Sequence, residues 1–89
     1  MALFKLGSVA ATPAALQFCD IHKINPLKLL GRHVTGDYGN LSVDDTAANI
    51  HAVKHGLRIF SSYNFGQNKV WIITEADRSS TCMLLPDEY

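Results

Sequence analysis

The apolar positions in the first half of the chain repeat at helical spacing, in three stretches separated by polar residues and prolines. The first stretch begins at Thr12-Pro13, where threonine can cap free N–H groups and proline suits the first turn. Asn25-Pro26 repeats this punctuation and begins a second helix that runs to His33. Ser42 caps a third helix, which ends at His55-Gly56 because glycine readily takes a left-handed conformation. The pattern therefore predicts three helices.

After the third helix the period changes to the alternation that is typical of strands. Residues 57–65 alternate and are rich in Ile, Phe and Tyr, and residues 69–75 are apolar on both faces, which indicates a central strand. A last strand is predicted over 81–85, and a short strand near 8–11 can join the sheet edge. We expect a single α+β domain over residues 1–89, with three N-terminal helices packed on a small antiparallel sheet of three to four strands that includes a C-terminal hairpin.

Composition and charge exclude several classes of protein. The chain is 47% apolar and 18% charged, which argues against disorder. Eight basic and eight acidic residues cancel, so no global field attracts nucleic acid. No segment has the length of a membrane helix, and the first residues lack the apolar stretch of a signal peptide. Cys19 and Cys82 form no CxxC pair, and we expect free thiols in a reducing cytoplasm.

Two short patterns are compatible with metal or phosphate binding, but the sequence favours a simpler interpretation of each. His51 and His55 have a metal-binding spacing, yet Ala52 stands where a zincin has glutamate, and a solvated helix face is favoured. Residues 36–39 are glycine-rich but follow a helix and lack the spacings of nucleotide-binding loops, which favours a structured turn. We therefore expect neither a metal nor another cofactor.

Two polar junctions, each following an apolar element, are the candidate site. Arg32 and His33 end the second helix. They either only stabilise the helix end, or they place a cation and a titratable base beside the polar loop that follows. Residues 74–81 are a polar stretch that follows the most apolar strand. They form either a hydrated hairpin or a place where the sheet presents functional groups. If both junctions face one ligand, Arg78 is exposed and contributes little to folding. The residues expected to bind a ligand are Arg32, His33, Asp37, Tyr38, Arg58, Thr74, Glu75 and Arg78.

Several stretches resemble a family of short proteins found on plasmids, phages and integrated elements. The match spans nearly the whole chain and is most specific at residues 71–79, Trp-Ile-Ile-Thr-Glu-Ala-Asp-Arg-Ser, and at residues 84–89, Leu-Leu-Pro-Asp-Glu-Tyr. Further matching stretches are residues 11–16, 29–33, 36–41, 55–59 and 61–63, with Tyr38 where the family pattern has tryptophan. Some members are labelled a methylase subunit of a type I restriction system, but this chain lacks the AdoMet-binding glycine motif and the Asn-Pro-Pro-Tyr motif. The resemblance implies mobile-element biology rather than a reaction.

Two functions of different classes are compatible with these features. The favoured one is a small, non-catalytic, cytoplasmic accessory or anti-defence protein that binds a host defence protein or a small phosphorylated, nucleotide-like ligand, with arginines holding carboxylate or phosphate oxygens. The alternative is a metal-independent ribonuclease resembling the barnase, colicin and RelE-type group, and only here is nucleic acid a partner. Its base, cation and hydroxyl or acid would come from His33, Arg58, Glu75, Arg78 and Thr81. The sequence leaves open whether the chain forms a homodimer.

Overall fold

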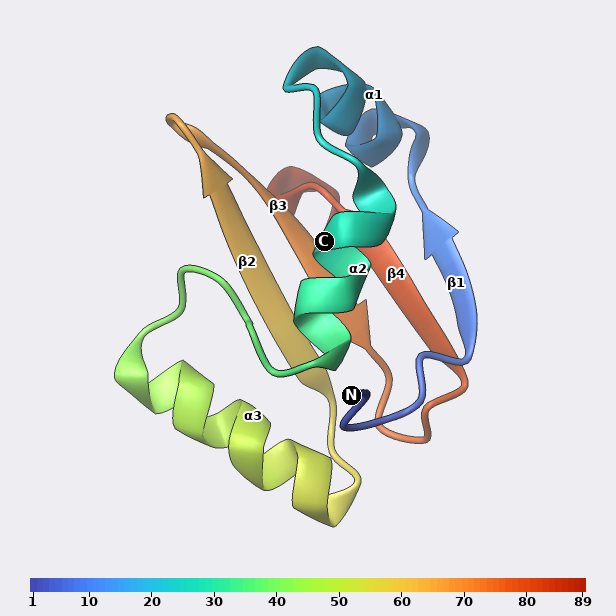
Figure 1. The fold of residues 1–89 in the computed structure, drawn as a ribbon, viewed down its shortest axis with the longest axis vertical. Coiled ribbons are helices and arrows are strands. Elements are labelled where there is room, and N and C mark those ends of the chain that lie inside the picture. The colour runs from blue at the N-terminus through green and yellow to red at the C-terminus, as the bar shows by residue number, and fades with distance from the viewer.

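A short strand opens the chain, three helices follow, and three strands complete a sheet, in a computed structural model that describes residues 1–89 (Figure 1). The elements are β1 (Ser8–Ala11), α1 (Pro13–Ile21), α2 (Pro26–Val34), α3 (Val43–His55), β2 (Ile59–Phe65), β3 (Asn68–Thr74), β4 (Ser80–Leu84) and the 3₁₀ turn η1 (Pro86–Glu88). The predicted α+β class is confirmed, and so is the change from helices to strands after α3.

The helix ends lie where the capping residues predict them. Side-chain oxygens of Thr12, Asn25 and Ser42 each accept a hydrogen bond from a backbone N–H in the first turn of the following helix, at 3.0 to 3.1 Å. These bonds satisfy donors that a helix start otherwise leaves free. At the end of α3, Gly56 takes the left-handed conformation, with φ +66°. Local chemistry therefore determines where all three helices begin.

The four strands form one mixed sheet in the order β1-β4-β3-β2. Short turns force β2, β3 and β4 to alternate in direction, and Ser61 lies opposite Ile72 in the antiparallel hairpin. β1 runs parallel to β4, with Val9 beside Thr81. The prediction of a wholly antiparallel sheet is wrong at this strand, because the helices between β1 and β2 leave the direction of β1 free.

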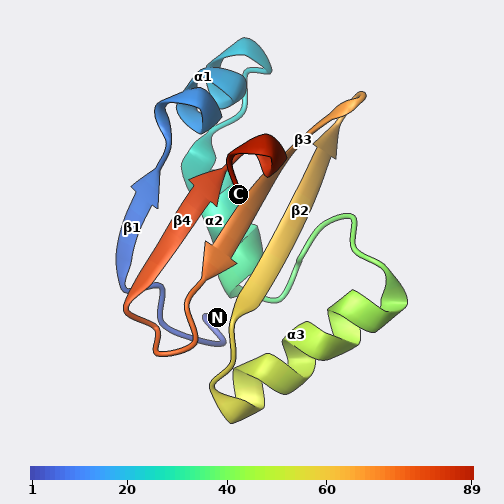
Figure 2. The ribbon, with the colours of Figure 1, turned by 180° about the vertical axis from the view of Figure 1, so that it is seen from behind.

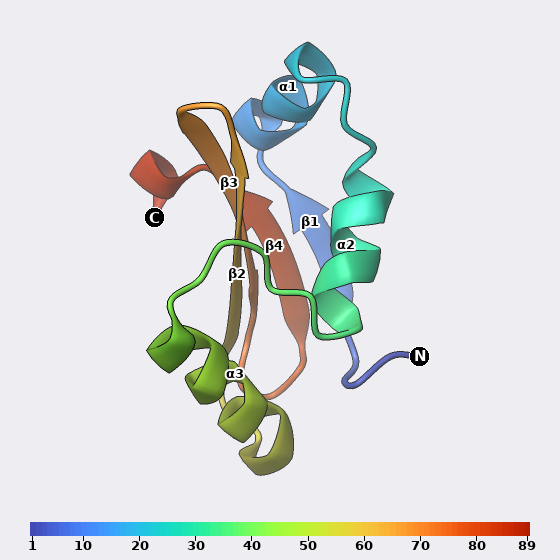
Figure 3. The ribbon, with the colours of Figure 1, turned by 60° about the vertical axis from the view of Figure 1, so that its left-hand side comes forward.

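Only two of the three helices cover a face of the sheet. Figure 3 shows α1 and α2 on one side, η1 on the other, and α3 beside the end of β2 at which that strand begins. The predicted packing of helices on the sheet is right for α1 and α2 and wrong for α3. The main core lies under α1 and α2 and consists of Ala15, Phe18, Cys19, Leu29, Leu30, Tyr63, Val70, Ile72 and Met83.

α3 and the loop before it close the outer edge of β2. The side chain of Asn49 donates to the carbonyl oxygen of Phe60 at 2.6 Å and accepts from its N–H at 3.1 Å. Two residues on, the carbonyl of Tyr38 accepts from the N–H of Ser62, and the N–H of Asn40 donates to the Ser62 carbonyl. These bonds pair backbone groups that an edge strand otherwise exposes.

Both cysteines are free thiols, as predicted. Cys19 is buried and its sulfur lies 3.8 Å from that of Met83, whereas Cys82 is half-buried. Burial raises the pKa of both thiols above the usual value. No helix of the structure combines the length and the apolar character that crossing a membrane requires.

Candidate functional site

Four polar side chains form a continuous hydrogen-bonded chain inside the protein. The His33 imidazole of α2 contacts the Ser61 hydroxyl through Nδ1 at 2.5 Å and the Thr74 hydroxyl through Nε2 at 2.9 Å. Thr74 contacts Thr81 at 2.7 Å, and the Thr81 hydroxyl donates to the Leu6 carbonyl at 2.7 Å. All four side chains are fully buried. We call this set, which runs from Ser61 through His33, Thr74 and Thr81 to the Leu6 carbonyl, the buried polar chain.

The Leu6 carbonyl fixes the direction of the hydrogen bonds from Thr81 back to Nε2 of His33, and a neutral imidazole fixes the direction of the bond from Ser61. Because the single proton of Thr81 goes to Leu6, the Thr81 oxygen accepts from Thr74. The Thr74 oxygen in turn accepts from Nε2–H of His33, and Nδ1 accepts from Ser61. This arrangement needs a neutral imidazole, and burial lowers the pKa of His33 from 6.5 to about 4. His33 is therefore uncharged at neutral pH.

The buried polar chain contains two of the predicted ligand-binding residues, His33 and Thr74, and Thr81 of the alternative ribonuclease hypothesis. The structure does bring the end of α2 against the end of β3, through His33 and Thr74, but the contact lies in the interior. Thr81 lies beside Thr74 in the same interior position. A ligand cannot reach these side chains unless the core opens, so their evident role is to join the helix layer to the sheet.

Arg78 holds together the backbone at the end of α3. Its guanidinium donates to the carbonyls of Leu57 at 2.6 Å and Ala52 at 2.9 Å, and to those of Glu75 and Ala76 at 3.1 and 3.2 Å. The Arg78 backbone has φ +61°, in the left-handed region. A cation at carbonyls near a helix end is stabilising. The expectation of an exposed Arg78 that contributes little to folding is therefore wrong, because carbonyls at the end of α3 and in its own loop share its donors.

Arg32 is engaged by an acid from the loop that follows α2. Its Nε lies 2.7 Å from Oδ2 of Asp37, its Nη2 lies 3.3 Å from Oδ1, and its Cζ lies 4.6 Å from the centre of the Tyr63 ring. The hydrogen bond from Arg32 holds the pKa of Asp37 below its usual value. Tyr38 is buried and packs edge-on against His33. An anion that bound Arg32 would have to compete with Asp37.

The remaining predicted residues, Arg58 and Glu75, are exposed at other places. The Arg58 guanidinium lies 5.4 Å from the centre of the Tyr89 ring, which packs edge-on against Trp71. Trp71 alternates with the core residue Ile72, so Arg58 and Arg32 lie on opposite sides of the sheet. The eight predicted residues are thus dispersed. Two lie in the buried polar chain, two form a surface ion pair, Tyr38 is buried against His33, Arg78 binds backbone carbonyls, and Arg58 and Glu75 are exposed elsewhere.

The two histidines with metal-binding spacing are neighbours on α3. The rings of His51 and His55 lie 4.2 Å apart, in a tilted arrangement. The structure contains no group of three or more His, Cys, Asp or Glu side chains placed to hold a metal ion.

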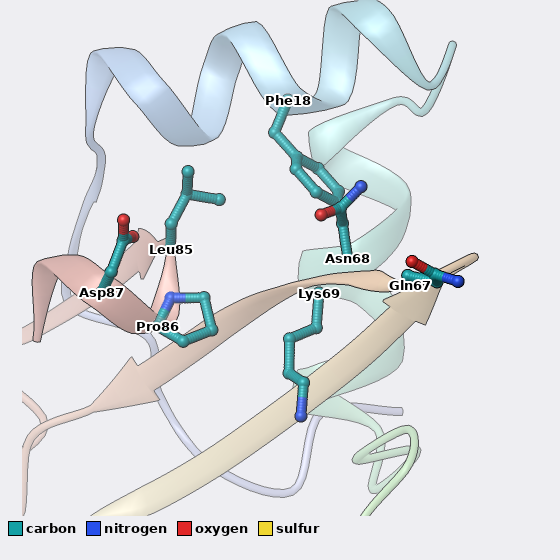
Figure 4. Close-up of a pocket in the computed structure, with 7 residues that line it drawn as sticks. All are labelled: Phe18, Gln67, Asn68, Lys69, Leu85, Pro86 and Asp87. Atoms are coloured by element: carbon teal, nitrogen blue, oxygen red, sulfur yellow. The ribbon is translucent and has the colours of Figure 1, made fainter.

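A cavity of about 320 Å³ opens on the surface away from these residues. It lies between α1, the turn that joins β2 to β3, and η1, as the close-up in Figure 4 shows. Its lining residues are Phe18, Gln67, Asn68, Lys69, Leu85, Pro86 and Asp87. Three segments far apart in the sequence build it, so no local motif marks it, and the sequence shows these residues only as turn formers and a strand end.

The cavity combines an apolar wall with polar groups at its rim. The Phe18 ring packs against the His22 ring in a tilted arrangement, with centroids 4.3 Å apart, and Leu85 and Pro86 face the cavity from the other side. Lys69 and Asp87 are exposed and form no ion pair within the chain. In Figure 4 the Lys69 ammonium points away from Phe18, so the Lys69 side chain would have to rotate to contact a ligand bound in the cavity. The size is at the lower end of the range of about 300–1,000 Å³ for small-molecule sites.

No protein-family model, curated protein or solved structure matches this chain.

Proposed function

We propose that this chain is a small, non-catalytic accessory or anti-defence protein of a mobile genetic element, and that it acts in the cytoplasm by binding a small nucleotide-like ligand. The mobile-element context comes from the sequence resemblance. The observation that carries the binding function is the cavity, where an apolar wall meets unpaired Lys69 and Asp87.

Three parts of the cavity each suit one part of such a ligand. A flat base can lie against Phe18, Leu85 and Pro86, which bury apolar surface. The side-chain amides of Gln67 and Asn68 each offer donors and an acceptor to the polar edge of a base. Lys69, as a flexible point charge at the rim, suits a phosphate group. The ligand class is therefore a nucleoside monophosphate rather than a bare anion.

The positions of the acid–base candidates favour binding over catalysis. A ribonuclease needs a base and a cation around one phosphate. His33 is fully buried with both ring nitrogens engaged, and the Arg78 guanidinium is occupied by backbone carbonyls. Arg58 lies on the far side of the sheet from Arg32. The alternative hypothesis has no comparable cluster to support it.

Calorimetric titration tests the proposal with nucleoside monophosphates, the matching nucleosides and inorganic phosphate as probes. We expect a monophosphate to bind, and both the nucleoside and phosphate to bind more weakly. Lys69→Ala should weaken monophosphate binding roughly tenfold, the loss of one charge-assisted contact. Lys28→Ala is the matched control, because Lys28 is an exposed lysine of α2 outside the cavity. The absence of binding by every nucleotide at millimolar concentration would refute the proposal.

A further inference from the structure

One edge of the sheet is covered by other parts of the chain, and the opposite edge is open. The outer edge of β2 is covered by Asn49 and by the loop that contains Tyr38 and Asn40. At the other edge, Figures 1 and 2 show β1 as the outermost element, with no helix or loop along its outer side. Proteins usually protect such edges, since unpaired backbone groups readily recruit another strand.

The hydrogen bonds of β1 show which of its backbone groups are free. The N–H groups of Ser8 and Thr12 donate to carbonyls of Ser79 and Met83, each at 3.0 Å, and so point toward β4. Alternate residues of a strand turn their backbone groups to opposite sides. Val9 and Ala11 therefore turn their N–H and C=O groups outward, where the structure places no partner.

These free groups are arranged so that the edge complements itself. Val9 and Ala11 lie symmetrically about Ala10, so in an antiparallel second copy Val9 would face Ala11 and exchange a reciprocal pair of hydrogen bonds, twice. Ser8–Ala11 carries no charged side chain, so two copies bring no like charges together. The Val9 side chain is 50% exposed and would cover the small Ala11 of the other copy.

We propose that β1 pairs with β1 of a second copy of this chain about a two-fold axis, joining two sheets into one. A two-fold interface needs a patch that matches itself, which the Val9–Ala11 edge supplies. A second copy fits this edge because the exposed Val9 then lies against the small Ala11 at both ends of the pairing, and because the uncharged stretch brings no like charges together. The dimer goes beyond the proposed nucleotide binding and does not depend on it.

Amide hydrogen exchange at increasing protein concentration, with sedimentation analysis, tests the dimer. We expect a concentration-dependent dimer in which the Val9 and Ala11 amides become protected, whereas the Thr12 amide, already bonded to Met83, changes little. Val9→Pro removes one outward donor without touching the bonds to β4, and should raise the dimer dissociation constant roughly tenfold or more. Val9→Lys keeps the donor and should also weaken pairing, because it sets a charge on the edge.

Leu27→Lys is the matched control, since Leu27 is an apolar residue of α2 that is 73% exposed. This variant should dimerise like the wild type, and circular dichroism should show that all variants are folded. A chain that stays monomeric at millimolar concentration would overturn the proposal. So would a dimer that leaves the Val9 and Ala11 amides unprotected. Nucleotide binding by Val9→Lys should equal that of the wild type, so the two proposals can fail separately.

Discussion

His33 and Thr74 meet at 2.9 Å in the interior, and their contact joins the end of α2 to the end of β3. The same imidazole also accepts a hydrogen bond from Ser61 on β2, and Thr74 forms a further hydrogen bond with Thr81 on β4. One histidine therefore links the helix layer to three adjacent strands. The hydrogen bond that Nδ1 accepts from Ser61 requires the neutral ring, which makes the stability of the fold sensitive to acid.

The first prediction is that the free energy of unfolding falls as the pH falls from about 7 to about 4.5. The folded pKa of His33 is about 4 and the ordinary value is 6.5, so between these values the unfolded chain binds the proton and the folded chain does not. The neutral ring contributes its full stability above about pH 6.5 and loses it toward pH 4. The whole shift corresponds to about 3 kcal/mol, measurable by urea titration at each pH.

His33→Gln is the control for this pH dependence. An amide keeps one donor and one acceptor for Ser61 and Thr74 but does not titrate in this range. Its unfolding free energy should be lower than that of the wild type at neutral pH and nearly flat down to about pH 4.5. Asp37, Asp77 and Glu88 have pKa values held below the usual range, so their contributions fall at lower pH. Equal slopes in both proteins would contradict the role of His33.

The second prediction is that Arg78→Ala destabilises the protein by about 2 kcal/mol, because several backbone carbonyls lose a charged donor. Two of these carbonyls, on Ala52 and Leu57, lie at the end of α3 and just beyond it. Arg58→Ala, at an exposed arginine with no such bonds, should change stability by less than about 0.5 kcal/mol. Denaturant melts of the two variants measure the difference. Equal effects would show that the carbonyls are satisfied as well by water.

Local features of this fold could be predicted from the sequence, and features made by distant segments could not. Thr12 and Gly56 mark helix ends because each acts on its own neighbours in the chain. The apolar residues on both faces of the stretch around Ile72 indicate a central strand for the same reason. Arg78 lies in a stretch with an ordinary surface sequence. Its hydrogen bonds to carbonyls of α3 form only because α3 packs beside its loop in the folded protein.

The candidate site shows the same division. The sequence suggests that the end of the second helix, with His33, faces the polar edge that contains Thr74. It does not show that both are buried, because a histidine that ends a helix can face either way. Phe18 from α1 and Asp87 from η1 both line the cavity, and the sequence around either residue does not indicate that the two lie close together. The direction of β1 likewise depends on packing rather than on its four residues.

The third prediction compares two glycines that have opposite environments. Gly39 has φ +78°, and a side chain there would overlap the carbonyl oxygen of Ser62, so Gly39→Ala should cost at least about 2 kcal/mol. Gly31 lies inside α2 with no atom near the position of a Cβ, so Gly31→Ala should stabilise by roughly 0.5–1 kcal/mol. Thermal melts give both signs. A stabilising Gly39→Ala would show that the loop does not pair with β2 as described.

The last prediction concerns Asn49, the side chain of α3 that closes the edge of β2. It is 4% exposed and holds both backbone groups of Phe60. Asn49→Ala leaves these groups unpaired in a partly buried place and should cost about 2–3 kcal/mol. Asn49→Asp keeps the acceptor for the Phe60 N–H but sets a carboxylate against the Phe60 carbonyl, so it should not rescue stability at neutral pH. Ala48→Ser, at the exposed neighbouring position, should be nearly neutral. Hydrogen exchange locates the effect, because the Phe60 amide should lose protection in Asn49→Ala while amides of β3 keep theirs. An unchanged Phe60 amide would mean that water or another group closes this edge.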